Sequence, residues 1–327
     1  MNLYLATIEG LVIAQRTGND WRFVSQSLAE KALTCLAISE AGPIYAGDVD
    51  GVYRSTDGGA TWHAWMDGLT VRHTRWMACR GDRVFVGTEP ASIFVRGAAG
   101  SAWRECTGVA ALRDQHRWSL PYSPEAGCVR GFAFHGSRAY AAVEVGGALR
   151  SDDGGESWSL CAGSSGNPSM SVSPASSFYP DVHSIEVHPS SPDLVYAPDG
   201  GGFYRSMDGG GTWQLCYDCY VRAAWIDPAD AEHIILGPAD GVSSNGRIEE
   251  SRDGGRSWSK ASHGLDVPWR RHMVERFLQV DGDLIAVLSN GELLAATLAS
   301  STAPSARLEW KRILPDLPDV NAAASGM

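Results

Sequence analysis

Basic side chains recur at one register of six predicted β-strands. Each of these strands ends in an apolar residue, at Ile38, Cys79, Phe134, Val187, Ile226 and Val280, and four positions earlier stand Thr34, Arg75, Arg130, His183, Arg222 and Arg276. Because side chains four residues apart on a strand share a face, the five ionisable residues of this set are expected on equivalent faces. Guanidinium groups suit bidentate binding of a carboxylate or phosphate. Buried arginines need compensating charge, so the pattern predicts a small-anion site or, alternatively, pairing of each arginine with an Asp or Glu of a neighbouring unit.

A second set, two residues earlier on the same face, carries groups that can move protons or attack a substrate. It consists of His73, Cys128, Asp181, Tyr220 and Val274. An Asp, a His and a Tyr near an anion site can serve as proton donor, base or nucleophile. We therefore interpret Asp181, Tyr220 and His73 as candidate catalytic residues. The candidate ligand-binding residues are Arg75, Arg130, His183, Arg222 and Arg276.

The elements that must position these side chains follow from an internal repeat. The pattern S-x-D-G-G-x-[ST]-W occurs four times, at residues 55–62, 151–158, 206–213 and 251–258. The Asp of each copy is expected to accept hydrogen bonds from N–H groups of its own turn, and the paired glycines allow the positive φ of a tight hairpin. The Trp is expected to begin the next strand and to be buried beneath the turn. Repetition of this kind indicates a repeat architecture.

Weaker copies of the same pattern end at Trp21, Trp103 and Trp310, which raises the number of units to seven. Each unit predicts four short strands, and no helix is expected. The N-terminal unit supplies only three strands, at residues 2–7, 11–16 and 21–25. The segment 318–324 near the C-terminus fits the missing first strand, and its addition would leave no open sheet edge.

The repeat resembles the Asp-box (BNR) repeat of β-propellers, a family that includes sialidases, xyloglucan-cleaving glycosidases, sortilin-like receptors and a photosystem II assembly factor. The resemblance implies an all-β, seven-bladed β-propeller with Asp-box turns, formed by residues 1–327 as a single domain, whose ring is closed by the C-terminal strand completing the N-terminal blade. It also implies that the first strand of each blade lines a central channel, which the arginines would surround. The implied structural Asp-box residues are Asp57, Asp153, Asp208 and Asp253.

The activity of the family carries over less readily than its fold. Sialidases combine an arginine cluster with a Tyr nucleophile and an Asp acid, but this chain lacks their [FY]-R-I-P segment and has seven units where they have six blades. A seven-bladed uronate lyase uses clustered histidines to hold a metal, so a metal-dependent lyase is a further alternative. The histidines concerned would be His73, His116, His183 and His272. Otherwise no metal or cofactor is expected, because the lone pair Cys216 and Cys219 has no second pair to complete a zinc site.

Composition restricts the partners. The net charge of −11 and the sequence pI of about 5.3 argue against nucleic acid or an anionic membrane as the main partner. No apolar run approaches the ~20 residues of a membrane span, and the N-terminus lacks the features of a signal peptide. The seven cysteines are scattered and odd in number, as expected for thiols in a reducing compartment. We therefore expect a cytoplasmic protein without membrane insertion.

Two functions follow from these patterns. The first is a propeller that binds a small anionic ligand, such as an acidic sugar, at an arginine-lined channel mouth and acts as a glycosidase-like hydrolase or a lyase. The alternative is a non-catalytic binding or assembly scaffold that docks an acidic protein segment or a cofactor. Two long segments, residues 107–129 and 162–182, are expected on the ligand face, where loops on a rigid scaffold commonly bind.

Overall fold

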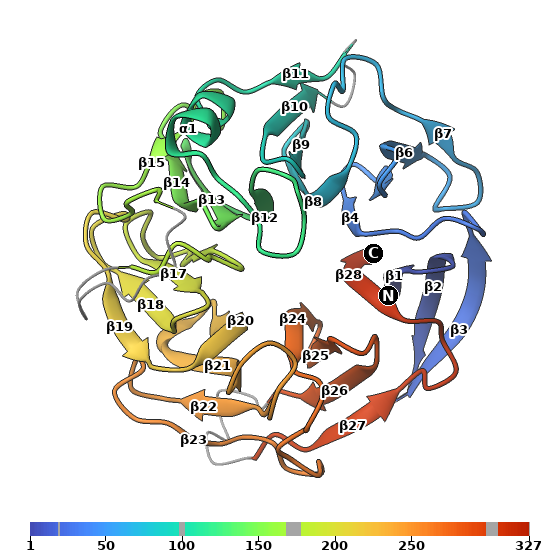
Figure 1. Ribbon diagram of the computed structural model, residues 1–327. Coiled ribbons are helices and arrows are strands. Elements are labelled where there is room, and N and C mark those ends of the chain that lie inside the picture. The colour runs from blue at the N-terminus through green and yellow to red at the C-terminus, as the bar shows by residue number, and fades with distance from the viewer. Residues whose placement is uncertain (19, 98–101, 168–177, 299–306, 327) are drawn as a thin grey trace. The chain divides into compact units, whose positions relative to one another are not determined.

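Seven four-stranded antiparallel sheets make up the fold (Figure 1). The computed structural model describes residues 1–18, 20–97, 102–167, 178–298 and 307–326. The chain divides into two compact units, unit 1 with Met1–Leu33 and Cys219–Met327, and unit 2 with Thr34–Asp218. Three sheets belong to unit 1 and four to unit 2. The predicted all-β, seven-bladed propeller fold is therefore confirmed, whereas the assignment of residues 1–327 to a single domain stays a prediction.

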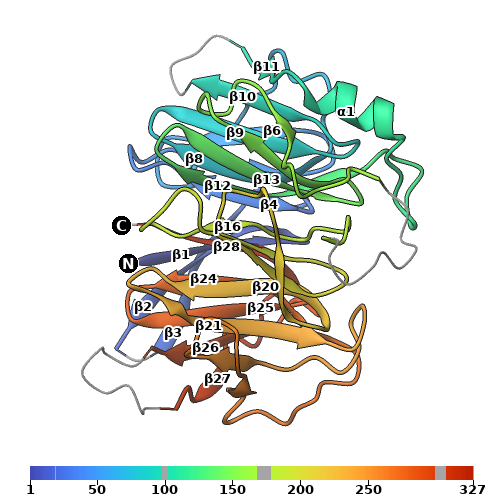
Figure 2. The same cartoon turned by 90° about the vertical axis from the view of Figure 1, so that its left-hand side faces the viewer.

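Unit 1 contains the blade that joins the two ends of the chain. Its strand order is β28-β1-β2-β3, and β28 pairs with β1 from Asn2↔Gly326 to Thr7↔Val320. The two strands lie side by side in Figures 1 and 2. The predicted completion of the N-terminal blade by a C-terminal strand is confirmed. The strands of unit 1 are β1 (Asn2–Thr7), β2 (Gly10–Thr17), β3 (Asp20–Ser27), β20 (Tyr220–Asp227), β21 (Asp230–Ala239), β22 (Glu249–Ser251), β23 (Ser259–Lys260), β24 (Val274–Val280), β25 (Asp283–Leu288), β26 (Leu293–Thr297), β27 (Trp310–Ile313) and β28 (Val320–Gly326).

Unit 2 consists of four consecutive blades, each with its strands in chain order. They are β4 (Cys35–Ile38), β5 (Ile44–Gly47), β6 (Val52–Ser55), β7 (His63–Ala64), β8 (Thr74–Arg80), β9 (Arg83–Thr88), β10 (Ile93–Gly97), β11 (Arg104–Glu105), β12 (Cys128–His135), β13 (Arg138–Glu144), β14 (Gly147–Ser151), β15 (Ser159–Leu160), β16 (Glu186–Val187), β17 (Val195–Pro198), β18 (Phe203–Ser206) and β19 (Gln214–Tyr217). The outermost strands β7, β11 and β15 have two residues each.

One helix contradicts the expectation of an all-strand chain. The helix α1 (Val109–His116) begins after Gly108, whose φ is 99°, in the long segment between two blades of unit 2. Only Val109 of this helix is buried, so its two turns carry too little apolar periodicity to be recognised in the sequence. Its Ala, Leu, Arg and Gln residues are nevertheless strong helix formers. Within the described ranges, no helical segment has the length and apolar character that a membrane span requires.

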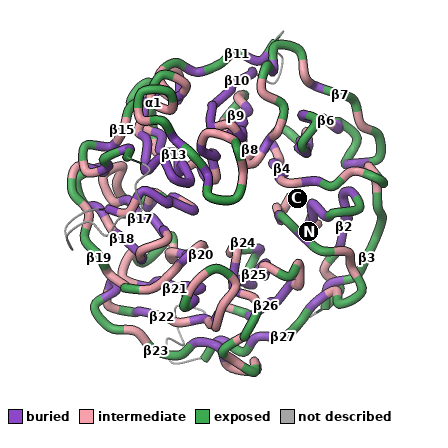
Figure 3. The backbone as a smooth tube through the Cα atoms, viewed as in Figure 1, coloured by how far each residue is buried: buried purple, intermediate pink, exposed green. Residues whose placement is uncertain are grey.

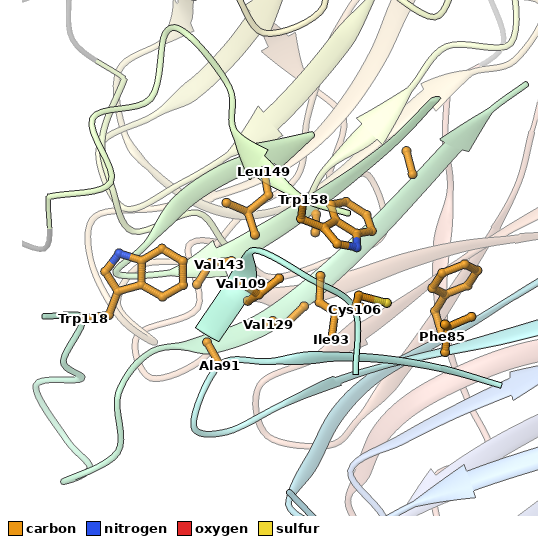
Figure 4. Close-up of a cluster of buried hydrophobic side chains, with 13 residues drawn as sticks. Phe85, Ala91, Ile93, Cys106, Val109, Trp118, Val129, Val143, Leu149 and Trp158 are labelled. Atoms are coloured by element: carbon orange, nitrogen blue, oxygen red, sulfur yellow. The ribbon is translucent and has the colours of Figure 1, made fainter. Parts of the chain in front are cut away.

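The apolar core lies between neighbouring blades, because the second strand of a blade is covered on both faces. In β13 every residue after Arg138 is buried, which Figure 3 shows as a purple strand. Figure 4 shows one such cluster, in which Phe85 and Ile93 of one blade meet Val129, Val143 and Trp158 of the next. Burying each such side chain contributes about 1.5–3 kcal/mol, so a blade without a neighbour would lose most of its stability.

The four strong Asp-boxes form the same hydrogen-bond network. In each, the Ser hydroxyl donates to the Asp carboxylate at 2.7–2.8 Å and accepts from the N–H of the second Gly at 2.8–2.9 Å. In the first box the Thr61 hydroxyl and N–H donate to Asp57 at 2.5 and 2.9 Å. Gly58 and Gly59 have φ of 75° and 95°, as expected of this turn. The weaker copies fall partly on residues 19, 98–101 and 299–306, which lie outside the described residues, but Trp21, Trp103 and Trp310 are buried.

The Asp carboxyl makes the stability of the Asp-box depend on pH. The hydrogen bond from the Thr61 hydroxyl, followed by that from the Thr61 N–H, holds the pKa of Asp57 below its ordinary value. A lowered pKa means that the folded state favours the carboxylate. The resulting stabilisation is present above the ordinary Asp pKa of about 3.9 and is lost as the pH falls through the lowered value.

The buried member of the box is the serine and not the aspartate. Ser55, Ser151, Ser206 and Ser251 are at most 2% exposed, whereas Asp57, Asp153 and Asp208 are exposed and Asp253 is half-buried. The Asp accepts from N–H groups at the rim of the turn, while the Ser hydroxyl accepts from a buried glycine N–H.

We predict that Ser151→Ala destabilises the fold more than Asp153→Ala. The first change leaves the buried N–H of Gly155 without an acceptor, at a cost of about 1–3 kcal/mol, whereas the second removes bonds to exposed groups that water can replace. Urea unfolding followed by tryptophan fluorescence measures both, with the exposed Ser159→Ala as a control that should change little. A larger loss for Asp153→Ala would contradict this assignment.

Candidate functional site

The predicted ligand-binding arginines of unit 2 each face a carboxylate of their own blade. Arg75 on β8 lies with its Nε 3.4 Å from Oε2 of Glu89, and Arg130 on β12 donates from Nη1 to Oε2 of Glu144 at 2.9 Å. Both carboxylates are at most 5% exposed and stand at the end of the adjacent antiparallel strand. Both arginines therefore form ion pairs, but with a carboxylate of their own blade and not with one of a neighbouring unit, which the sequence had suggested as the alternative.

Backbone irregularities place these side chains. The pairing of β8, β12, β20 and β24 with the following strand shifts register near the start of each. The skipped residues are Arg75, Arg130, Arg222 with Ala223, and Glu275. Such a β-bulge turns a side chain away from the regular alternation of the strand. A strict period of two could not predict these orientations.

In β24 of unit 1 the bulge displaces a predicted arginine from the common register. The bulged residue there is Glu275, while Arg276 pairs regularly with Val287, so the predicted alignment of Arg276 with the other arginines is displaced by one residue. Glu275 Oε1 lies 2.5 Å from Nη1 of Arg222 on the neighbouring strand β20. Arg222 also donates from Nε to the Tyr220 hydroxyl at 3.0 Å. Glu275 was not predicted as a site residue. Its signal in the sequence is its position directly before Arg276.

The three predicted catalytic residues lie in different surroundings. His73 Nδ1 is 4.0 Å from Oε2 of Glu89, and burial lowers the pKa of His73 although the Glu89 carboxylate opposes this. Asp181 is 7% exposed, and its Oδ2 lies 3.4 Å from Nε2 of His183. Within the described part of unit 2, no contact joins His73 to Asp181. Tyr220 belongs to unit 1. The catalytic roles of these residues stay predictions.

The histidines considered as metal ligands do not form one cluster within unit 2. His116 ends α1 and faces Gly166, and His73 lies beside Glu89. In unit 1, His272 stacks on Trp269 with ring centroids 5.2 Å apart. Among the described residues, the one group of three or more metal-ligating side chains consists of Glu144, Asp181 and His183. No disulfide joins Cys216 and Cys219.

Acidic residues after the second strands divide into two structural roles. Asp48 and Asp199 close their own turns, and each accepts two backbone N–H groups at 2.7–3.0 Å. Glu89 and Glu144 instead face arginines.

A cavity of about 380 Å³ lies in unit 1, beside β22 and β23. Arg247 lies in its wall and is held by Asp240 Oδ1 at 3.1 Å and Glu249 Oε1 at 2.7 Å. This cavity was not predicted from the sequence, because its residues come from a loop and from two short strands. The lining consists of Asp240, Asn245, Arg247, Ile248, Glu249, Lys260, Ser262, Val267 and Pro268.

The repeat family described as BNR/Asp-box repeat matches residues 53–64 and 149–160. These ranges contain two of the four boxes whose hydrogen bonds are described above. The chain is an Asp-box β-propeller. Comparison of its sequence with curated proteins gives no match.

Solved structures of similar fold come from proteins of several kinds. An ancestral GH74 enzyme is 16% identical with a TM-score of 0.64, over 86% of this propeller and 38% of its own chain. YCF48 bound to D1 peptide is 15% identical with a TM-score of 0.62, over 92% and 89% of the two chains. A putative 6-phosphogluconolactonase from Bacteroides uniformis is 12% identical with a TM-score of 0.64, over 99% and 98%. This propeller thus spans well under half of the GH74 enzyme, and at these identities the likeness shows the fold alone.

We predict that Arg130→Ala lowers the free energy of unfolding by about 3–5 kcal/mol, as expected when one partner of a buried ion pair is removed. The Glu144 side chain is 4% exposed and would lose the guanidinium that faces it. Chemical denaturation measures the loss. Arg104→Ala is the matched control, because Arg104 is 55% exposed and its pair with Glu156 should contribute less than about 1 kcal/mol. Equal losses in the two variants would show that the Arg130 pair is not a buried one.

Proposed function

We propose that this propeller is a non-catalytic binding protein that docks an acidic, partly apolar segment of a partner protein in the cavity of unit 1. The observation that carries the proposal is the composition of the cavity wall, where apolar surface from Ile248, Val267 and Pro268 adjoins the cation Lys260. A volume of about 380 Å³ falls within the range of about 300–1,000 Å³ typical of ligand sites. It is large enough for one or two side chains of a bound segment.

The exposed cation in the wall is the feature that suits an acidic group. Arg247 is held by Asp240 and Glu249, and with Lys260 the four charged side chains of the wall sum to zero. Lys260 is exposed on β23 and forms no ion pair within the described part of the chain. A carboxylate of the partner would therefore meet Lys260, while an adjacent apolar side chain packs against Val267 and Pro268.

The arginine ion pairs support docking over capture of a small anion. Arg75, Arg130 and Arg222 each face a carboxylate already. An anion that bound these guanidinium groups would have to displace Glu89, Glu144 or Glu275, and breaking a buried pair costs about 3–5 kcal/mol. A segment bound in the cavity of unit 1 leaves all three pairs intact.

The comparison with YCF48 gives further support. YCF48 is bound to D1 peptide, and nearly the full lengths of both chains correspond. A propeller of this length is thus sufficient to bind a protein segment. We also propose that the protein works in the cytoplasm, on the sequence argument from its scattered cysteines.

We predict that peptides selected from a random display library on the full chain are enriched in acidic and apolar residues. Calorimetric titration of the selected peptides should show affinity reduced by about tenfold or more in Lys260→Glu, because a desolvated charge pair worth about 1.5–3 kcal/mol becomes repulsive. Lys311→Glu, at the exposed pair with Asp20 in the same unit, is the control and should bind as the wild type does. Basic consensus peptides, or affinity unchanged by Lys260→Glu, would rule out this mode of docking.

A second candidate function is an anion-binding glycosidase. The observation in its favour is the contact of Arg222 with both the Tyr220 hydroxyl and Glu275, since a nearby cation and carboxylate can assist a Tyr nucleophile. The likeness to GH74 enzymes supports the fold that this function would need.

If the propeller is such an enzyme, it should hydrolyse at least one member of a panel of aryl glycosides that includes uronides and sialosides. Tyr220→Phe should then reduce kcat by about 10²–10⁴-fold, the range for loss of a positioned proton-transfer group. Mass spectrometry of the trapped intermediate and steady-state kinetics measure this. Absence of turnover, together with absence of uronate or sugar-phosphate binding in calorimetry, would leave docking as the function.

A further inference from the structure

We propose that Glu144, Asp181 and His183 bind one divalent transition-metal ion, of the chemical class of Zn²⁺, between two neighbouring blades of unit 2. Each residue offers a ligand atom, and these atoms lie within 4.8 Å of one another. The side chains are 4%, 9% and 1% exposed. Two carboxylate oxygens and one imidazole nitrogen form a donor set that Zn²⁺ commonly accepts.

The backbone holds these donors in place from two blades. Glu144 is the last residue of β13, and Asp181 and His183 precede β16 of the next blade. A bridge between Val182 and Asp199 and the hydrogen bond from His183 N–H to Pro198 O, at 3.0 Å, fix the second segment. The bond from Gly147 N–H to Pro180 O, at 2.9 Å, ties it to the blade that carries Glu144. Donors on such rigid elements are suited to a metal site.

The spacing between donors fits a shared ion. Nε2 of His183 lies 3.4 Å from Oδ2 of Asp181, which is longer than the 2.7–3.2 Å typical of an N–H···O hydrogen bond. Two donors bound tetrahedrally to one ion at about 2.1 Å stand about 3.4 Å apart. The most separated donors, at up to 4.8 Å, would need side-chain shifts of roughly 1 Å to complete the coordination.

The charges of the cluster also favour a cation. Glu144 and Asp181 bring two buried carboxylates into this region, and Arg130 brings one guanidinium. Buried like charges are costly unless a cation compensates them. A bound cation would offset the excess carboxylate, and the bond from Arg130 to Glu144 would orient the Glu144 carboxylate from outside the coordination sphere.

A glycine leaves room beside the cluster. A Cβ at Gly200 would lie only 2.6 Å from Oδ2 of Asp181, so any other residue there would displace this oxygen. The proposed ion differs from the predicted histidine site, of which only His183 takes part. It is also independent of the cavity in unit 1, because all three ligands belong to unit 2.

The test is titration of the metal-stripped full chain with Zn²⁺ by calorimetry and with Co²⁺ by visible absorption. We expect one equivalent to bind, with Co²⁺ bands of low coordination number and no thiolate-to-cobalt charge-transfer band, which excludes the cysteines as ligands. Asp181→Asn and His183→Gln should each weaken binding by more than about 100-fold, because outer partners alone contribute about 10–100-fold. Zn²⁺ should raise the melting temperature of the wild type and of neither variant.

His233→Gln is the matched control. His233 is also a buried histidine between two carboxylates, but its Nδ1 and Nε2 are bonded separately to Asp227 at 3.1 Å and to Glu250 at 2.8 Å. This variant should keep wild-type affinity. If His183→Gln fails to fold, Asp181→Asn and Glu144→Gln, which preserve side-chain shape, make the same comparison. Absence of stoichiometric Zn²⁺ binding, a thiolate band, or unchanged affinity in Asp181→Asn would each overturn the proposal.

Discussion

Burial of both faces of the second strand in each blade is the constraint on which this fold depends. Residues along β5, β9, β13, β17 and β25 are almost all buried, so no blade can remain without neighbours. The same requirement explains why β28 joins β1. Without it, β1 would expose a row of unpaired backbone groups together with the apolar side chains Leu3 and Leu5. The strong Asp-boxes lie between the third and fourth strands of their blades and stabilise the turns there.

The sequence predicted those structural features that depend on a few residues close together in the chain. The glycines and serines of the boxes determine their turns, and the spacing of Trp residues determined the number of blades. The complementary ends predicted the pairing of β28 with β1 to within about two residues of its observed bounds. These features depend on residues close together in the chain, and so a single sequence contains them. The helix α1 was missed because one buried residue in two turns leaves almost no periodic pattern.

The candidate site could be predicted only in part, because it depends on register. The sequence raised pairing with an acid of a neighbouring unit as an alternative for the arginines, whereas Arg75 and Arg130 face carboxylates of their own blades. It could not locate the bulges that turn these side chains out of strict alternation. In β24 the bulge falls at Glu275 and not at Arg276. The residue at this position is therefore an acid that pairs with Arg222, where a cation was expected. A one-residue shift therefore changes the sign of the charge at that position.

This arrangement of charge bears on what a propeller of this kind can bind. An arginine that already faces a carboxylate is neutralised and oriented, so it contributes to the stability of its blade and attracts a free anion only weakly. Lys260, exposed at the cavity of unit 1, has a charge that a partner can still use. In unit 2 the excess lies on the acidic side, since Asp181 adds to the Glu144 and Arg130 pair. The first place thus offers an exposed cation and the second a buried carboxylate. A carboxylate-bearing segment suits the first and a divalent cation suits the second.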